Sequence, residues 1–484
     1  MCKVRFMVFA GAALSLSACG DDGGREASDS GTASATAVTA TTDSASSDAS
    51  GSESETTAGP DGTGSDSEGS TTAGTTVEPS TTTDETTETT DATTGVDPTT
   101  TATDSDTDSD TDTETTDDPC QGMGGGMLDF SYIWVANSAE GTVSKINTLN
   151  MIEEGRYVVR PDSAGNPSRT SVNLRGDVAV ANRFGGVAKI AARVEDCVDL
   201  NANNTIDTST GKFDVRPWGA EECLLWYTDF PQFSVMRPMA WTAGTFNEQT
   251  CGYENQLAWT TGAVAGNPGS IHALALDGET GVVVHDVPVP EVAVGGAGPY
   301  GGAVDGQNNF WFHHRDSPPY PLVKVDGVTL QHTVYTVPDP INPYGITVDT
   351  NQRVWLAGYQ GAIGRFDPIN ETWDVIQGYT GLGIQEDANK RMWVAKYPWG
   401  TTGAWGFDID TLQLVGEIDL TGEASSSRGL SIDFEGNVWI VEEGARAYRV
   451  NVNNGNTWDV YDGLTGAYTY SDMTGWGLKN VIPE

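Results

Sequence analysis

The chain has 484 residues, and its 68 acidic against 25 basic residues give a formal net charge of −43. Binding to nucleic acid or to an anionic membrane surface needs a basic face, so this charge balance disfavours both. The length would suit two domains, but repeats in the second part predict one large β domain over residues 119–484.

The N-terminus has the features of a bacterial export signal. Two basic residues precede an apolar run from Phe6 to Leu16, and Leu16-Ser17-Ala18-Cys19 resembles a lipobox. A run of about eleven residues is too short for a membrane span of roughly twenty. We therefore expect residues 1–19 to be a lipoprotein signal peptide with Cys19 as the lipidation site. The alternative is ordinary secretion, with a cysteine at the cleavage site by chance.

Residues 20–118 are almost wholly Thr, Ser, Asp, Glu, Gly and Ala, with Arg25 as the single basic residue. Such a segment buries too little apolar surface to offset the entropy of ordering, and its carboxylates repel one another. It is predicted to be a disordered acidic linker. Together with a lipid on Cys19, it would display the following domain in the cell envelope, at the outer membrane or cell surface. Contact with the membrane would be through the lipid anchor alone.

The chain has few cysteines for its size, and an exported protein meets oxidising conditions. Of six cysteines, Cys2 falls in the signal peptide and Cys19 is assigned to the lipid, which leaves four. Exported proteins form disulfides, so we expect Cys197 to pair with Cys223. Pairing of Cys120 with Cys251 is the default for the remaining two.

From Ile133 onwards the chain repeats one pattern seven times: a short apolar strand, a turn, and a strand led by an aromatic residue. Recurrence every forty-odd residues is typical of a β-propeller. We therefore predict an all-β fold, a seven-bladed β-propeller. The clearest aromatic strands are Phe310-Trp311-Phe312, Val354-Trp355-Leu356, Met392-Trp393-Val394 and Val438-Trp439-Ile440.

The two ends of the repeat region complement each other. Ile133-Trp134-Val135 lacks an inner strand before it, while residues 473–478 resemble an inner strand with no aromatic strand after it. The N- and C-terminal strands are therefore predicted to complete one shared blade, which removes open sheet edges. The interval from Ala179 to Trp259 is nearly twice the usual step. It predicts a Cys-flanked, Asn-rich insertion at about 195–225, or alternatively a degenerate extra blade.

Two sets of repeated residues are interpreted as structural. The Trp column is expected to pack between blades, the alternative being a stacking platform for a substrate. The acidic residues of the turns are expected to satisfy backbone groups rather than to act as catalytic carboxylates. They are Asp305, Asp349, Asp387 and Asp433.

Positions at one end of the central channel vary from blade to blade, as expected of a ligand site on a symmetric scaffold. Three residues after each Trp position stand Asn137, Asn182, Gly262, His314, Gly358, Lys396 and Glu442. The following position adds Ser138, Arg183, Arg315, Tyr359, Tyr397 and Glu443, and the inner-strand starts add Ser168, Tyr300, Tyr344, Leu382, Arg428 and Thr474. From these we expect the ligand to be bound by Asn137, Asn182, Tyr300, Tyr344, Lys396 and Arg428.

The repeat resembles one known family. Residues 343–349, Pro-Tyr-Gly-Ile-Thr-Val-Asp, followed by Val354-Trp355-Leu356 and by Gly361-Ala362-Ile363-Gly364-Arg365-Phe366-Asp367, are similar to blades of the streptogramin B lyase (virginiamycin B lyase) family. The likeness extends from about residue 129 to the C-terminus. It implies a carbon-oxygen lyase that opens a cyclic depsipeptide by elimination with Mg²⁺, a His base and a Glu. Glu442 matches the Glu of that repeat, and His314 would be the base.

The insertion carries a possible Ca²⁺ loop. Asp199, Asn201, Asn203 and Asp207 occupy positions 1, 3, 5 and 9 of a pattern that resembles the loops of EF-hands and dockerins. Asn204 replaces the usual Gly, and Thr210 stands where a bidentate acid is usual. A weak structural Ca²⁺ site is one interpretation, and a plain Asx-rich turn is the other.

Three functions follow as hypotheses. The first is a monomeric, lipid-anchored propeller that binds a small molecule, a peptide or an envelope component at its channel mouth. The second is a streptogramin B lyase-like enzyme that uses His314, Glu442 and Mg²⁺. The third is a structural envelope protein whose ring binds nothing small.

Overall fold

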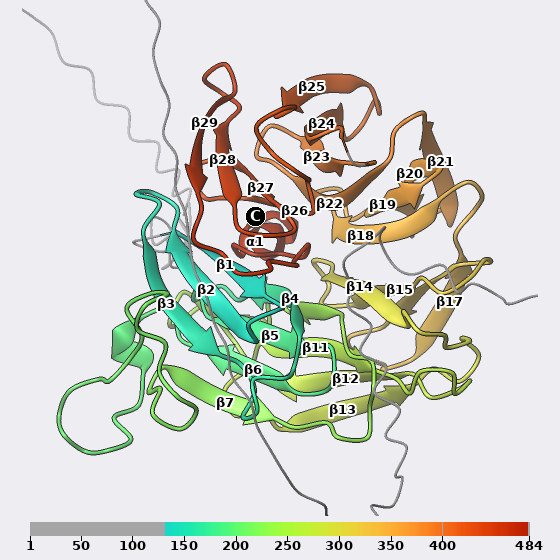
Figure 1. The fold of residues 1–484 in the computed structure, drawn as a ribbon. Helices are drawn as coiled ribbons and strands as arrows, with labels where there is room; N and C mark the ends of the chain where they lie inside the picture. The colour runs from blue at the N-terminus through green and yellow to red at the C-terminus, as the bar shows by residue number, and fades with distance from the viewer. Residues whose placement is uncertain (1–130, 399, 483–484) are drawn as a thin grey trace, which may run out of the picture. The chain divides into compact units, whose positions relative to one another are not determined.

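Seven antiparallel β-sheets are arranged around a central axis as the blades of a propeller (Figure 1). The computed structural model describes residues 131–398 and 400–482, all within the unit Thr116–Glu484. The predicted signal peptide, Cys19, the acidic linker and Cys120 lie outside the described residues. The prediction of an all-β seven-bladed propeller is confirmed.

Each repeat supplies the strands of one blade, and in blades 2 to 7 the first strand is innermost. Blade 1 contains β1 (Tyr132–Asn137), β2 (Thr142–Asn147) and β3 (Glu153–Val158); blade 2 contains β4 (Pro167–Val172), β5 (Val178–Asn182), β6 (Val187–Ile190) and β7 (Leu224–Thr228). Blade 3 contains β8 (Met239–Trp241), β11 (Leu257–Gly262), β12 (His272–Asp277) and β13 (Val283–Pro288).

The last four blades are the most regular, and they correspond to the clearest sequence repeats. Blade 4 contains β14 (Pro299–Val304), β15 (Phe310–His314), β16 (Pro321–Val325) and β17 (His332–Thr336); blade 5 contains β18 (Asn342–Val348), β19 (Val354–Gln360), β20 (Ala362–Asp367) and β21 (Thr372–Gln377). Blade 6 contains β22 (Gly381–Glu386), β23 (Arg391–Lys396), β24 (Gly403–Asp408) and β25 (Leu414–Asp419); blade 7 contains β26 (Gly429–Ile432), β27 (Val438–Val441), β28 (Ala447–Asn451) and β29 (Thr457–Tyr461).

The Trp and Asp columns act together. In blades 4 to 7 the indole N–H of the Trp donates to the Asp six residues earlier at 2.8 Å, as in the pairs Trp311–Asp305 and Trp439–Asp433. The same Asp accepts backbone N–H groups of its turn. Each Trp is buried in the core. The indole thus packs among apolar side chains while its one donor is satisfied, which makes both columns structural.

The C-terminal segment closes the ring. The amide of Trp134 donates to Met473 O at 2.8 Å, and the amide of Tyr468 donates to Ala136 O at 3.1 Å. Residues 467–473 therefore pair with β1 as the inner strand of blade 1, so the two ends of the repeat region share one blade as predicted. The inner strand lies a few residues earlier than the predicted 473–478.

The long interval in blades 2 and 3 contains two insertions rather than an extra blade. Residues 191–223 join β6 to β7 and include a short 3₁₀ turn, η1 (Val194–Asp196). Cys197 and Cys223 form a disulfide across this insertion. A small hairpin of β9 (Thr245–Asn247) and β10 (Gly252–Glu254) follows β8. Cys251 in that hairpin is also disulfide-bonded, and its partner lies outside the described residues.

A short helix, α1 (Trp476–Val481), follows the closing strand and lies at the centre of the ring (Figure 1). Its Leu478 and Val481 are buried. It is held by blades 5 and 6, since Gln352 donates to Val481 O at 2.9 Å and Trp476 donates to Glu386 O at 2.9 Å. These contacts lie at the face of the Asp-containing turns. Among the described residues no helix has the length and apolar character to cross a membrane.

Glu386 links α1 to the blades and predicts a pH effect. It is buried and accepts hydrogen bonds from the Thr350 amide at 2.7 Å and from Asn480 at 2.9 Å. Burial raises the pKa of its carboxyl from 4.5 to about 7. A raised folded-state pKa contributes stability that is complete below pH 4.5 and is lost as the pH rises through 7.

We therefore expect Glu386→Gln to remove the contribution of this carboxyl group to the pH dependence of the free energy of unfolding. Between pH 4.5 and 7.5 the parent protein should lose roughly 2–3 kcal/mol more unfolding free energy than the variant, because each pKa unit corresponds to about 1.4 kcal/mol. Urea denaturation at several pH values measures this difference. Parallel curves for the two proteins would contradict the assignment.

Candidate functional site

The inner strands of all seven blades begin at the same end of the channel, which we call the channel mouth. At or just before those starts, the blades place one residue each near the axis: Tyr468, Arg169, Arg237, Tyr300, Tyr344, Leu382 and Arg428. All seven are buried. Four of them form one hydrophobic group with Tyr470, so side chains pack against one another at this end of the ring.

The aromatic members are joined through their hydroxyl groups. Tyr468 Oη lies 2.9 Å from Tyr300 Oη and 2.9 Å from Tyr344 Oη. Arg428 donates to Tyr344 Oη at 2.7 Å and also bonds Glu443. Tyr suits these positions because its ring packs with its neighbours while its hydroxyl finds a partner.

Arginines from several blades converge on these rings. The guanidinium carbon of Arg315 lies 4.7 Å from the Tyr344 ring centroid, that of Arg237 lies 4.8 Å from Tyr300, and that of Arg183 lies 5.1 Å from Tyr468. Such distances are those of cation–π contacts. We call this group the arginine–tyrosine cluster: Arg169, Arg183, Arg237, Arg315, Arg428, Tyr300, Tyr344, Tyr359, Tyr468 and Tyr470.

Arg169 is fully enclosed within the cluster. It is 0% exposed, and its guanidinium carbon lies 3.1 Å from the Tyr470 ring centroid. Nη1 donates to Ser168 O at 2.9 Å, whereas Nε and Nη2 have no hydrogen-bond partner among the described residues. Burial lowers the pKa of Arg169 to about 9, with nearby tyrosines acting in the opposite direction and Arg237 adding to the lowering. The hydroxyl of Tyr470 likewise has no partner in the described part of the chain.

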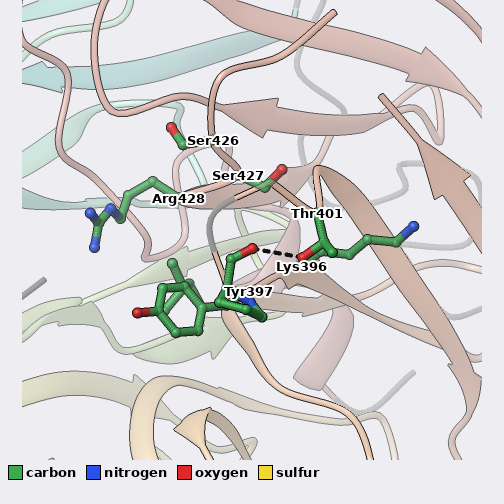
Figure 2. A pocket seen from close by; sticks show the side chains of 8 residues that line it. Lys396, Tyr397, Thr401, Ser426, Ser427 and Arg428 are labelled. Carbon is green, nitrogen blue, oxygen red and sulfur yellow. Dashed lines mark hydrogen bonds between the residues drawn. The ribbon is translucent and has the colours of Figure 1, made fainter. Parts of the chain in front are cut away.

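A shallow pocket adjoins the cluster between blades 6 and 7 (Figure 2). It is lined by Leu382, Lys396, Tyr397, Pro398, Thr401, Ser426, Ser427 and Arg428. The side chains of Arg428 and Lys396 extend in opposite directions from it (Figure 2). Tyr397 also packs against Tyr359, with ring centroids 4.5 Å apart and ring planes tilted by 32°, so this pocket adjoins the tyrosines of the mouth.

Of the residues expected to bind a ligand, Tyr300, Tyr344 and Arg428 come together in the cluster. The other three are engaged in hydrogen bonds that hold the blades. Asn137 donates to Ser144 Oγ at 2.8 Å, Asn182 donates to Val159 O at 2.9 Å, and Lys396 donates to Glu417 at 2.7 Å. Asn182 thereby joins blade 2 to blade 1, and Lys396 also lies 4.1 Å from the Trp405 ring centroid.

His314 and Glu442 are buried and have local partners. His314 Nε2 lies 2.7 Å from Asp316 Oδ2, and Asp316 also accepts the amide of Ala297 at 2.6 Å. Glu442 accepts both Nε and Nη2 of Arg446 at 3.0 Å. They belong to blades 4 and 7, with blades 5 and 6 between them.

The residues predicted for Ca²⁺ do converge in the insertion. The side-chain amides of Asn201 and Asn203 each lie 2.9 Å from Asp207 Oδ2, and the Asn204 amide donates to Asp199 Oδ2 at 2.8 Å. Asn204 has φ +64°, the left-handed conformation that Asn tolerates in place of Gly. An Asn amide presents its oxygen instead of its NH₂ when it rotates by 180°, so this donor set fits a hard, oxygen-preferring cation.

No protein-family model matches the chain, and no curated protein matches it. Solved structures do resemble it. A streptogramin B lyase has 15% sequence identity and a TM-score of 0.45, covering 63% of this chain and 86% of that chain. Virginiamycin B lyase from Staphylococcus aureus has 15% identity and a TM-score of 0.42, covering 61% and 83%. A functionally unknown protein from Desulfotomaculum acetoxidans has 11% identity and a TM-score of 0.48, covering 70% and 98%.

The solved structures that resemble the chain thus include streptogramin B lyases, the family whose repeat it resembles, and the propeller itself is shown by the seven blades of this structure. At these identities the likeness carries nothing about activity.

Proposed function

We propose that the protein is a lipid-anchored, extracytoplasmic β-propeller that binds a ligand at its channel mouth. One observation supports the proposal above all: cationic and aromatic side chains from different blades meet at one end of the channel. The packing of strands within a blade does not require such a cluster. The other end receives α1, so the site is approached from one face. Convergent polar groups on an apolar, concave scaffold are typical of ligand sites.

The test is a screen of small molecules, peptides and envelope extracts against the mature protein by thermal shift, followed by calorimetry for each ligand found. Tyr359→Ala, at the mouth, should weaken binding, whereas Tyr253→Ala, on the β10 hairpin, should leave it unchanged. Both variants remove the same groups from half-buried positions. A protein that binds nothing in this screen would favour the structural envelope hypothesis.

The envelope location is proposed from the N-terminal signal. The Leu16-Ser17-Ala18-Cys19 motif supports lipidation, and the acidic linker supports display away from the membrane surface. Cys19→Ser is expected to move the protein from the membrane fraction to the soluble fraction. An unchanged distribution would refute the lipid anchor.

Binding is a better proposal than elimination. A lyase would need His314 and Glu442 to face one substrate and one Mg²⁺. Each side chain is instead buried beside an ionic partner, Asp316 for His314 and Arg446 for Glu442. In addition, blades 5 and 6 lie between blade 4, which carries His314, and blade 7, which carries Glu442. We expect a streptogramin B depsipeptide to remain intact with the purified protein and Mg²⁺. Ring opening that disappears in Glu442→Gln would reverse this choice.

We also propose a weak structural Ca²⁺ site at Asp199, Asn201, Asn203 and Asp207. The measurement is thermal unfolding with millimolar Ca²⁺ and after chelation, since extracellular loops of this kind bind at about 10⁻⁴–10⁻³ M. We expect Ca²⁺ to raise the unfolding temperature of the parent protein and not of Asp207→Ala. Mg²⁺ is the control ion, because it prefers stricter octahedral geometry. An equal response of parent and variant would favour the plain Asx-rich turn.

A further inference from the structure

Arg169 presents a physical problem that its own surroundings do not solve. A fully buried guanidinium ordinarily has a carboxylate or several carbonyl groups around it, because burying an unpaired charge costs several kcal/mol. Here one donor reaches Ser168 O, and Nε and Nη2 have no hydrogen-bond partner among the described residues. The Tyr470 ring stacks on one face of the group but cannot accept its in-plane N–H bonds.

The neighbours of Arg169 add positive charge rather than remove it. Arg237 and Arg169 both lie within 5 Å of the Tyr300 ring centroid, and Arg315 lies 5.0 Å from the same ring. A carboxylate, that of Glu443, contacts the cluster through Arg428. The chain as a whole is strongly acidic, so this concentration of cations is local.

We propose that the arginine–tyrosine cluster binds one oxyanion, a carboxylate, phosphate or sulfate group, against Nε and Nη2 of Arg169. This inference rests on the proposed function and names the chemistry of its ligand. The edge formed by Nε and Nη2 of a guanidinium matches two oxygens of such a group, which is the strongest geometry available to arginine. The hydroxyl of Tyr470, also without a partner among the described residues, supplies a further donor.

The burial of the cluster limits the size of what enters. Arg169 and Tyr300 are 0% exposed, and Tyr470 is 3% exposed. The oxyanion is therefore a small ion or the terminal group of a larger ligand whose remainder lies outside the ring. Sequence-independent recognition of a long polyanion would need an exposed basic face, which this site does not offer.

The experiment titrates inorganic phosphate, sulfate and acetate into the mature protein, with binding measured by calorimetry and by the shift in unfolding temperature. Arg169→Met removes the proposed contact, and Arg449→Met removes the same charge from β28, where Arg449 pairs with Asp459. We expect at least one oxyanion to bind the parent and the Arg449 variant alike. Its affinity should fall at least about thirty-fold in Arg169→Met.

The alternative results separate this inference from the proposed function. Oxyanion binding that is equally strong in Arg169→Met would overturn the assignment to Arg169. Failure of all three ions, together with capture of an uncharged ligand that Tyr359→Ala weakens, would overturn the oxyanion inference and leave the ligand site standing. Failure of every ligand would remove both.

Discussion

Removal of residues 467–484 is expected to leave the protein without a cooperative unfolding transition. These residues supply the inner strand of blade 1. Their removal eliminates the backbone hydrogen bonds from Trp134 to Met473 and from Tyr468 to Ala136. Met473 is also fully buried, in one core with Ile133 and Val135 of its own blade and with Trp439 of blade 7. Without the segment, β1 becomes an exposed, apolar edge strand in an open ring, which promotes association between chains.

A shorter deletion provides the control. Removing residues 476–484 takes away α1 but leaves the closing strand, so the ring should remain closed. The loss of buried Leu478 and Val481 should lower stability by about 3–6 kcal/mol while a single transition persists. Circular dichroism and calorimetry on both truncations measure the difference. If the longer deletion still unfolds in one sharp transition, closure by the C-terminus is not what stabilises the ring.

The fold could be predicted because its stabilising residues recur. Each regular blade repeats a buried Trp and an Asp six residues earlier, and the two side chains are joined in the structure. A contact made within one repeat leaves a periodic trace in the sequence. Blade 1 could be predicted from an incomplete repeat at each end of the repeat region. The first repeat lacked an inner strand, and the last segment was an inner strand without an aromatic strand after it.

The site was predicted only in part, since its members are joined by tertiary contacts rather than by repetition. Tyr300, Tyr344 and Arg428 stood at recognisable strand starts. Arg169 was missed by one residue, since the predicted position on β4 was Ser168 and the side chain that joins the cluster is that of its neighbour Arg169. Arg237 precedes a short strand in an irregular blade and carries no repeat signal.

The closing strand explains the remaining omissions. Its register was expected at residues 473–478, whereas the structure pairs residues 467–473 with β1. As a result, Tyr468 and Tyr470 lie at the channel mouth. Thr474 was predicted to lie there, but its hydroxyl donates to Ile432 O at the far end of β26. The alternation of Tyr468 and Tyr470 in a strand places both on one face, which is a signal that the sequence does contain.

Arg169→Met is expected to raise the free energy of unfolding in the absence of ligand, by about 1 kcal/mol or more. The substitution loses one hydrogen bond to Ser168 O and a cation–π contact with Tyr470, each worth about 1–2 kcal/mol. It also removes a buried charge that has no carboxylate partner among the described residues, whose desolvation costs several kcal/mol. Met matches the length of the side chain and packs well against tyrosine rings.

Arg428→Met is the matched comparison and should have the opposite sign. Arg428 is equally buried, but it bonds Tyr344 Oη and Glu443, so its removal leaves a partly buried carboxylate without its partner. We expect a loss of about 3 kcal/mol or more. Urea denaturation of both variants at neutral pH measures the two effects. Equal destabilisation would mean that Arg169 is a structural residue. If Arg169→Met instead raises the free energy of unfolding, and if this difference shrinks when an oxyanion binds and stabilises the parent, Arg169 contributes to ligand binding at the expense of stability.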